Sequence, residues 1–229
     1  GMRMLARRRS GRSLAVLLLL LLTDGCSGKS SGKKRRKPGS KPSAAAAAAA
    51  AETTTCAHCL AIQETIGRAI AQTLADEGAA VAICARGDDG IQAAKSELEA
   101  SGTTVYAAAA DMSDADSVKQ FVADAIDALG GVDIIVHNTS AMVGQGEEGW
   151  SSSFNIDVMA GVRAVESAMP ALEASDAASV VFIGTTASSE FFLQASSYGP
   201  MKAAMRAHAN ELAQMLGPKG IRVNVVSPG

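Results

Sequence analysis

Aromatic side chains are scarce in this sequence: they make up 3% of the residues, whereas hydrophobic side chains as a whole make up 48%. A β-sandwich core usually depends on aromatic anchors, so their scarcity disfavours that class. Alanine and valine supply much of the apolar volume, which suits a parallel sheet covered by alanine-rich helices. The composition therefore predicts an α/β fold, and 229 residues suffice for one large core.

Long apolar runs are also missing. The run Leu14–Leu22 has nine residues, which as a helix would rise about 14 Å, against about 30 Å for the hydrocarbon core of a bilayer. A stable membrane span is therefore not expected. Five arginines precede this run, an arrangement typical of a secretory signal. We predict targeting to an organelle or the secretory pathway, or a cytoplasmic protein if the leader is an artefact of the gene model.

Acidic residues are nearly absent from the first part of the chain. Residues 1–51 hold twelve of the 21 lysines and arginines but one of the 23 acids, which leaves residues 52–229 with nine basic and 22 acidic side chains. That acidic part lacks a basic face that would neutralise nucleic-acid phosphates, so we expect no nucleic-acid partner. We divide the chain into a leader with a low-complexity linker, residues 1–52, and a folded domain, residues 53–229.

Helical and strand patterns alternate along the folded domain. The apolar runs predict strands at 80–85, 104–109, 133–137, 179–184 and 221–226, with helices at 66–77, 90–100, 114–129, 150–173 and 198–216. Such alternation predicts a Rossmann-like, doubly wound parallel sheet with helices on both faces. Ligands bind at the carboxyl ends of the strands in such a sheet, so site residues are expected just after each strand.

Tyr198 and Lys202 begin the last predicted helix with an i, i+4 spacing, which places both side chains on one face. A tyrosine hydroxyl ordinarily has a pKa of about 10, so it exchanges protons near neutral pH only where a cation stabilises the phenolate. Lys202 can supply that charge. The pair therefore predicts an acid/base centre, although an isolated pair of this kind is more often an exposed helix face.

Other short motifs follow the predicted strands in a defined order. They are Asp111-Met112, Asn138, Thr185 and Pro228-Gly229. Together with the Tyr-x-x-x-Lys pair, this order resembles the short-chain dehydrogenase/reductase family over about residues 60–229. The resemblance implies a nicotinamide-dependent oxidoreductase that interconverts a secondary alcohol and a ketone. Its implied partners are a small carbonyl or alcohol substrate and further copies of the chain in a homo-oligomer.

The resemblance also implies roles for individual residues. Tyr198 would be the acid/base and Lys202 its electrostatic partner, which also holds the nicotinamide ribose. Thr185 stands in the place of the family's catalytic serine, but a threonine at a strand end could equally cap a turn. Asp157 stands where the family has an asparagine that supports a proton relay. The remaining implied cofactor contacts are Ile66, Gly67, Arg86, Asp111, Met112, Asn138, Pro228 and Gly229.

The phosphate-binding loop departs from the family pattern, which reads Thr-Gly-x-x-x-Gly-Ile-Gly. The corresponding segment here is Leu60–Gly67, and only Ile66 and Gly67 match. Glycines let the backbone approach a pyrophosphate, and Glu64 adds a like charge. The degenerate loop therefore leaves open a second function, that of a catalytically impaired Rossmann-like binding or scaffold protein. We also expect the domain to be incomplete at its C-terminus, because the family pattern continues beyond Gly229.

Cofactor choice in such domains depends on the residue that follows the second strand. Arg86 stands there, and a guanidinium can pair with a 2′-phosphate, so NADP(H) is favoured and NAD(H) remains an alternative. The competing interpretation is an arginine that merely caps the strand end. No metal is expected: Cys56 and Cys59 form a single Cys-x-x-Cys pair, and two ligands do not close a tetrahedral site.

Overall fold

A computed structural model describes residues 14–19, 57–142, 145–190 and 196–229. Its core is a sheet of six parallel strands in the order β3-β2-β1-β4-β5-β6. The strands are β1 (Ala15–Leu19), β2 (Ala80–Ala85), β3 (Val105–Ala109), β4 (Ile134–His137), β5 (Ser179–Ile183) and β6 (Arg222–Val226). This order is that of a Rossmann sheet, so the predicted fold class is confirmed.

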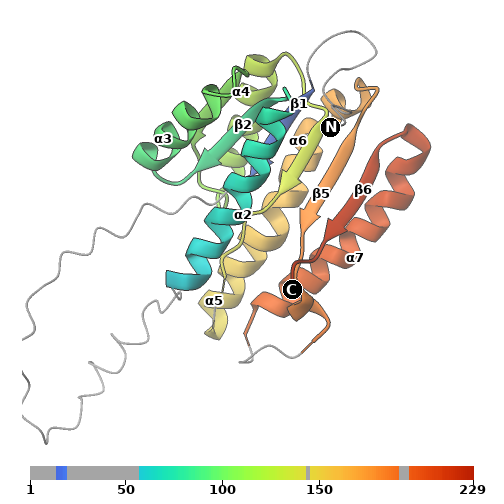
Figure 1. Ribbon diagram of the computed structural model, residues 1–229. Coiled ribbons are helices and arrows are strands. Elements are labelled where there is room, and N and C mark those ends of the chain that lie inside the picture. The colour runs from blue at the N-terminus through green and yellow to red at the C-terminus, as the bar shows by residue number, and fades with distance from the viewer. Residues whose placement is uncertain (1–13, 20–56, 143–144, 191–195) are drawn as a thin grey trace, which may run out of the picture.

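Helices cover both faces of the sheet (Figure 1). One apolar cluster joins the sheet to α2 (Ala57–Asp76) and α3 (Asp88–Glu99). A second cluster joins the opposite face to α4 (Ala115–Leu129), α6 (Ala160–Glu173) and α7 (Tyr198–Leu216). The shorter elements are α5 (Gly146–Ser153), the π-helix η1 (Phe154–Met159), and the 3₁₀ turns η2 (Thr186–Ser188) and η3 (Gly217–Lys219).

The central strand comes from a segment that we predicted to lie outside the fold. Residues 15–19 form β1, between β2 and β4, and Val16 and Leu17 are fully buried. The predicted domain boundary at residue 53 therefore does not separate the sheet from what precedes it. A short uncharged apolar run satisfies both a signal h-region and a parallel strand buried on both faces, so composition alone cannot distinguish the two. The targeting role of this run stays a prediction.

One buried carboxylate anchors β1 at its first residue. Asp133, which is fully buried, accepts a 2.7 Å hydrogen bond from the Ala15 N–H and a 2.5 Å bond from the Ser175 hydroxyl. The backbone N–H of Asp133 also donates to the Ala15 carbonyl, and its carbonyl accepts from Ser179. The side chain and backbone of this one residue thus link the starting points of β1, β4 and β5 at the amino edge of the sheet.

The long helix predicted at 150–173 is three consecutive elements. Helix α5 leads into η1, and α6 completes the run. A π-helix adds a residue to a turn and occurs often at functional sites, where it changes the direction of a side chain. No sequence pattern that we considered distinguishes such a turn from ordinary helix. In the described ranges, no helix is long and apolar enough to cross a bilayer.

Candidate active site

Lys202 lies at the carboxyl ends of β4 and β5 and is almost fully buried, at 3% exposed. Its Nζ donates to the Ile183 carbonyl at 3.1 Å and to the Thr139 carbonyl at 3.3 Å. The same atom is 3.4 Å from Oδ1 of Asp157, which is fully buried. Nζ also lies 5.9 Å from the centre of the Tyr198 ring. The predicted pair is therefore assembled at the ligand-binding edge of the sheet, not on an exposed helix face.

Asp157 comes from the π-helix, and its Oδ1 is buried without a hydrogen-bond partner among the described residues. Its Oδ2 accepts from the Ala141 N–H at 3.1 Å, and the Ser140 hydroxyl also hydrogen-bonds to the carboxyl group. Burial raises the pKa of Asp157, and the nearby charge of Lys202 opposes that rise. Burial likewise lowers the pKa of Lys202, against the pull of Asp157. The two groups form a coupled pair whose charges compensate each other in a site without solvent.

His137 is a third buried titratable group at this point and was not among the predicted site residues. Its Nε2 donates to the Asp157 backbone carbonyl at 3.1 Å, while Nδ1 has no hydrogen-bond partner. Burial and then the charge of Lys202 lower the pKa of His137 to about 3. The ring is therefore neutral at physiological pH, and it packs edge-on against Phe182 with ring centres 5.9 Å apart.

Two close contacts fix the first turn of α7, which carries Tyr198. The preceding residue, Ser197, is fully buried, and its hydroxyl lies 2.6 Å from that of the equally buried Ser153 at the end of α5. On the other side, a Cβ on Gly199 would lie 2.6 Å from the Ala187 carbonyl oxygen, so only glycine allows α7 this close to η2. The sequence analysis did not identify this serine pair. The sequence features that could have indicated it are the position of Ser197 beside Tyr198 and the position of Ser153 four residues before Asp157.

Thr185 lies between β5 and η2, two residues after the strand ends. Its hydroxyl oxygen accepts a 3.3 Å hydrogen bond from the Ala187 N–H, which is the turn-capping alternative raised above. A hydroxyl that accepts one hydrogen bond still has its proton to donate. Pro228 is brought to the same turn, because its carbonyl accepts from the Thr186 N–H at 3.2 Å. Gly229 follows it, and a Cβ added to this glycine would lie 3.6 Å from the Thr186 methyl group.

The predicted adenosine contacts occupy the other half of the same edge. Arg86 directly follows β2 and is exposed, and Asp111, after β3, is exposed as well. Asn138 follows β4 at the centre of the sheet and is 3% exposed. Met112 does not face this edge with its side chain: it is 1% exposed in the core, with its sulfur 4.0 Å from that of Cys84. Only its backbone could meet a cofactor.

Ile66 and Gly67 lie inside α2, nine and ten residues after its first residue, Ala57. The interpretation of Leu60–Gly67 as a phosphate loop is therefore wrong, because N–H groups within a helix are already bonded to carbonyls one turn back. In a Rossmann sheet the phosphate loop joins the first strand to the first helix. Here that connection is residues 20–56, which lie outside the described residues and contain Gly25, Gly28 and Gly32.

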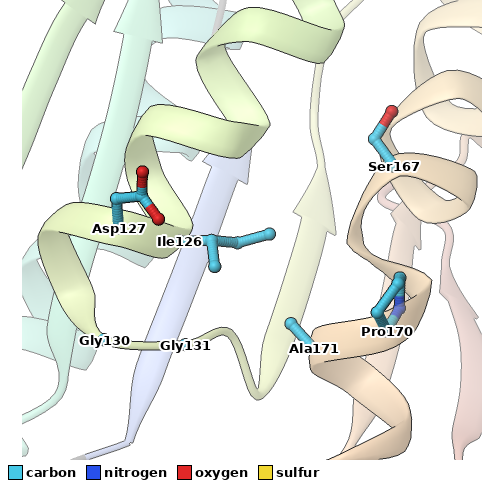
Figure 2. A pocket seen from close by; sticks show the side chains of 7 residues that line it. All are labelled: Ile126, Asp127, Gly130, Gly131, Ser167, Pro170 and Ala171. Atoms are coloured by element: carbon cyan, nitrogen blue, oxygen red, sulfur yellow. The ribbon is translucent and has the colours of Figure 1, made fainter.

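A surface pocket lies away from this edge. Figure 2 shows it between the last turns of α4 and α6, with Ile126 and Asp127 on one side and Pro170 and Ala171 on the other. Its lining includes Gly130 and Gly131, just before β4 begins, so it belongs to the amino edge of the sheet.

No cluster of three or more metal-ligating side chains occurs among the described residues. Cys56 falls outside them.

Comparison with known proteins identifies relatives along most of the chain. Residues 56–229 match the family described as short chain dehydrogenase. Isoepoxydon dehydrogenase of Penicillium expansum is 39% identical over 174 residues, which are 72% of this chain and 65% of that protein. The human dehydrogenase/reductase SDR family member 4 is 30% identical over 175 residues, 74% of this chain and 63% of its own length.

A solved structure agrees with the sequence relatives. L-sorbose reductase from Gluconobacter frateurii, solved with NADPH and L-sorbose, superimposes with a TM-score of 0.67 at 28% identity, over 72% of this chain and 65% of that one. The chain thus spans somewhat less than two thirds of the length of the relatives it matches. The family match covers well over half of the sequence, and the sheet order agrees with it. This chain belongs to the short-chain dehydrogenase/reductase family.

Proposed function

We propose that this protein is an NAD(P)-dependent oxidoreductase that interconverts a secondary alcohol and a ketone on a small molecule. The observation that carries the proposal is the burial of Lys202 between the ends of β4 and β5, with its Nζ 5.9 Å from the Tyr198 ring centre. A lysine is expensive to bury, so its position needs acceptors and a use for its charge. Support of a neighbouring tyrosine hydroxyl is such a use.

The described residues suit a dinucleotide along the carboxyl edge. The exposed Arg86 and Asp111 would meet the adenosine end, whereas Asn138, Lys202 and the Pro228-Gly229 pair would meet the nicotinamide end. One feature limits this fit: the hydrogens of the Lys202 ammonium face the carbonyls of Thr139 and Ile183 and the carboxylate of Asp157. To hold a ribose hydroxyl as well, Lys202 must share or exchange one of these long contacts.

The chain's own part in the reaction is proton supply and orientation. When bound, the cofactor would supply or accept the hydride. During ketone reduction Tyr198 would donate its hydroxyl proton to the carbonyl oxygen, and in the reverse direction its phenolate would take that proton back. The Thr185 hydroxyl would donate a hydrogen bond to the same oxygen while its own oxygen accepts from Ala187. Lys202 would stabilise the phenolate through its charge.

Cofactor binding tests this proposal before any substrate is known. The full chain is titrated with NADPH and with NADH while nicotinamide fluorescence is followed, in parallel with Lys202→Met and the exposed control Lys119→Met. We expect saturable binding that Lys202→Met weakens and Lys119→Met does not. The bound protein is then assayed against a panel of ketones and secondary alcohols. Absence of saturable binding favours the alternative, a Rossmann-like scaffold that does not use a nucleotide.

Two further properties remain proposals. A homo-oligomer is proposed from the family resemblance, and light scattering on the purified chain measures it. An organellar or secretory location is proposed from the arginine-rich start of the sequence, and the first residue of protein recovered from its own cell tests it. Because β1 lies at residues 15–19, cleavage after residue 22 would remove the central strand, so this measurement bears on the fold as well.

A further inference from the structure

Lys202 has a charged partner besides the tyrosine that it is proposed to serve. Oδ1 of Asp157 lies 3.4 Å from Nζ, whereas the Tyr198 ring centre lies 5.9 Å away. Both partners of the short contact are buried, at 3% exposed for Lys202 and 0% for Asp157. Opposite charges at this separation away from water interact strongly. A field acting from Lys202 on the tyrosine is therefore opposed at its source.

The surroundings of Lys202 and Asp157 accommodate the ionised form of both groups. Nζ donates hydrogen bonds to the carbonyls of Thr139 and Ile183, and Oδ1 of Asp157 lies 3.4 Å away as an ion-pair contact, without a hydrogen bond to that oxygen. Asp157 in turn faces donors, the Ala141 N–H and the Ser140 hydroxyl, as an ionised carboxylate requires.

No other charged group in the described surroundings replaces this balance. His137, on β4, is the remaining titratable side chain packed against the pair, and it is neutral because its pKa falls to about 3. β5 contributes a backbone carbonyl from Ile183. Tyr198 itself is the titratable neighbour on α7. Among the residues that the structure describes around this pair, the opposite charges are therefore those of Asp157 and Lys202.

We propose that Asp157 is the counterion of Lys202 and a positioning residue that keeps the Tyr198 hydroxyl protonated, by opposing the lysine's field. This deepens the proposed function and rests on it for the role of Tyr198. A tyrosine that stays protonated at neutral pH has the proton that ketone reduction needs. The phenolate that alcohol oxidation needs becomes available only at higher pH. The pair therefore favours proton donation over proton removal near neutral pH.

A direct titration of Tyr198 tests the proposal without cofactor or substrate. The chain has two tyrosines, so Tyr106→Phe leaves Tyr198 as the single phenol and removes a group whose own pKa is raised by burial. Phenolate absorbance is followed as pH rises, with circular dichroism to confirm that the protein stays folded. We expect Asp157→Asn to lower the midpoint by on the order of one pH unit. The exposed acid Glu148, on α5, supplies the control Glu148→Gln, with no change expected.

The parent protein alone gives a second reading that does not depend on how a variant folds. With the charge of Lys202 opposed by Asp157, its Tyr198 midpoint should stay near the value of about 10 for a free tyrosine instead of falling toward neutral pH. A parent midpoint well below that value, or an Asp157→Asn midpoint that is unchanged or raised, overturns the counterion role. Loss of NADPH binding with an intact titration shift overturns the proposed function instead. The two failures are therefore distinguishable.

Discussion

The two halves of the sheet differ in how far their candidate site residues already contact one another. In the half formed by β4, β5 and β6, buried contacts already join Tyr198, Lys202 and Asp157. In the half formed by β1, β2 and β3, the candidate cofactor contacts Arg86 and Asp111 are exposed side chains. The connection between β1 and α2 lies outside the described residues. The proposed proton chemistry and the proposed recognition of the adenosine end thus belong to different halves of the sheet, so that variants can disturb one without the other.

The largest expected effect is in the β4–β6 half. Tyr198→Phe keeps the ring but removes the exchangeable proton, so ketone reduction should fall at least about a hundredfold while thermal unfolding stays unchanged. Tyr106→Phe is the matched control in the other half, where the ring stacks on Phe121 and holds no proposed role. Steady-state rates of both variants with a substrate found in the panel above make the measurement. Full turnover by Tyr198→Phe would remove it from the mechanism.

The next effect tests whether β1 belongs to the folded domain. Leu17 is fully buried and pairs in register with Ile135 of β4, which is also fully buried. Truncation of a buried leucine or isoleucine costs about 2–5 kcal/mol of unfolding free energy. We expect Leu17→Ala and Ile135→Ala each to lower the unfolding free energy by an amount in this range, as measured by urea unfolding. If Ile135→Ala destabilises the protein and Leu17→Ala does not, residues 15–19 are not the central strand.

This comparison also shows what the sequence could predict about the fold. The strand at Ala80–Ala85 and the helix at Tyr198–Leu216 have the predicted bounds, because glycines and clear apolar periodicity define their ends. β1 was misassigned, because a run of leucines after arginines satisfies a targeting pattern equally well. Its pairing depends on Asp133, 118 positions away from Ala15, and a contact at that separation leaves no local pattern.

A smaller effect, on stability, concerns His137 in the β4–β6 half of the sheet. Its pKa in the folded protein falls to about 3 from 6.5, so the unfolded chain takes up a proton on acidification that the folded chain does not. This contribution to stability is complete above pH 6.5 and is lost as pH falls toward 3. Between pH 7 and pH 5 the loss should be about 2 kcal/mol.

Urea unfolding at several pH values isolates this contribution. His137→Phe should flatten the acid dependence of the unfolding free energy, even if it lowers stability overall. His208→Gln, on α7, is the control and should leave the slope in place. An unchanged slope in His137→Phe means that other groups cause the acid sensitivity.

The candidate site was predictable in its chemistry but not in its contacts. Tyr198 and Lys202 were found from spacing, because an i, i+4 pair on a helix has a fixed geometry. The direct ion pair with Asp157 was not predicted, because it joins a residue of the π-helix to a residue of α7 that lies far away in the sequence. The hydroxyl pair of Ser153 and Ser197 depends on the same packing of the two helices.

The smallest expected effect concerns cofactor choice in the β1–β3 half. Arg86 is exposed at the end of β2, where an acid would bind a ribose 2′-hydroxyl and repel a 2′-phosphate. A guanidinium pairs with phosphate, so Arg86→Ala should weaken NADPH about tenfold and leave NADH nearly unchanged. Asp88 and Asp89, exposed in the first turn of α3, oppose a phosphate and limit the size of this preference.

Dissociation constants for both cofactors decide the point, since only their ratio reports on the phosphate. Arg68→Ala is the matched control: Arg68 is an exposed arginine of the same half, but it is paired with Glu97 between α2 and α3. Its loss should change neither constant. If Arg86→Ala weakens the binding of NADH as much as that of NADPH, Arg86 caps the strand end without contacting the 2′-phosphate. The proposed preference for NADP(H) then lacks a residue that explains it.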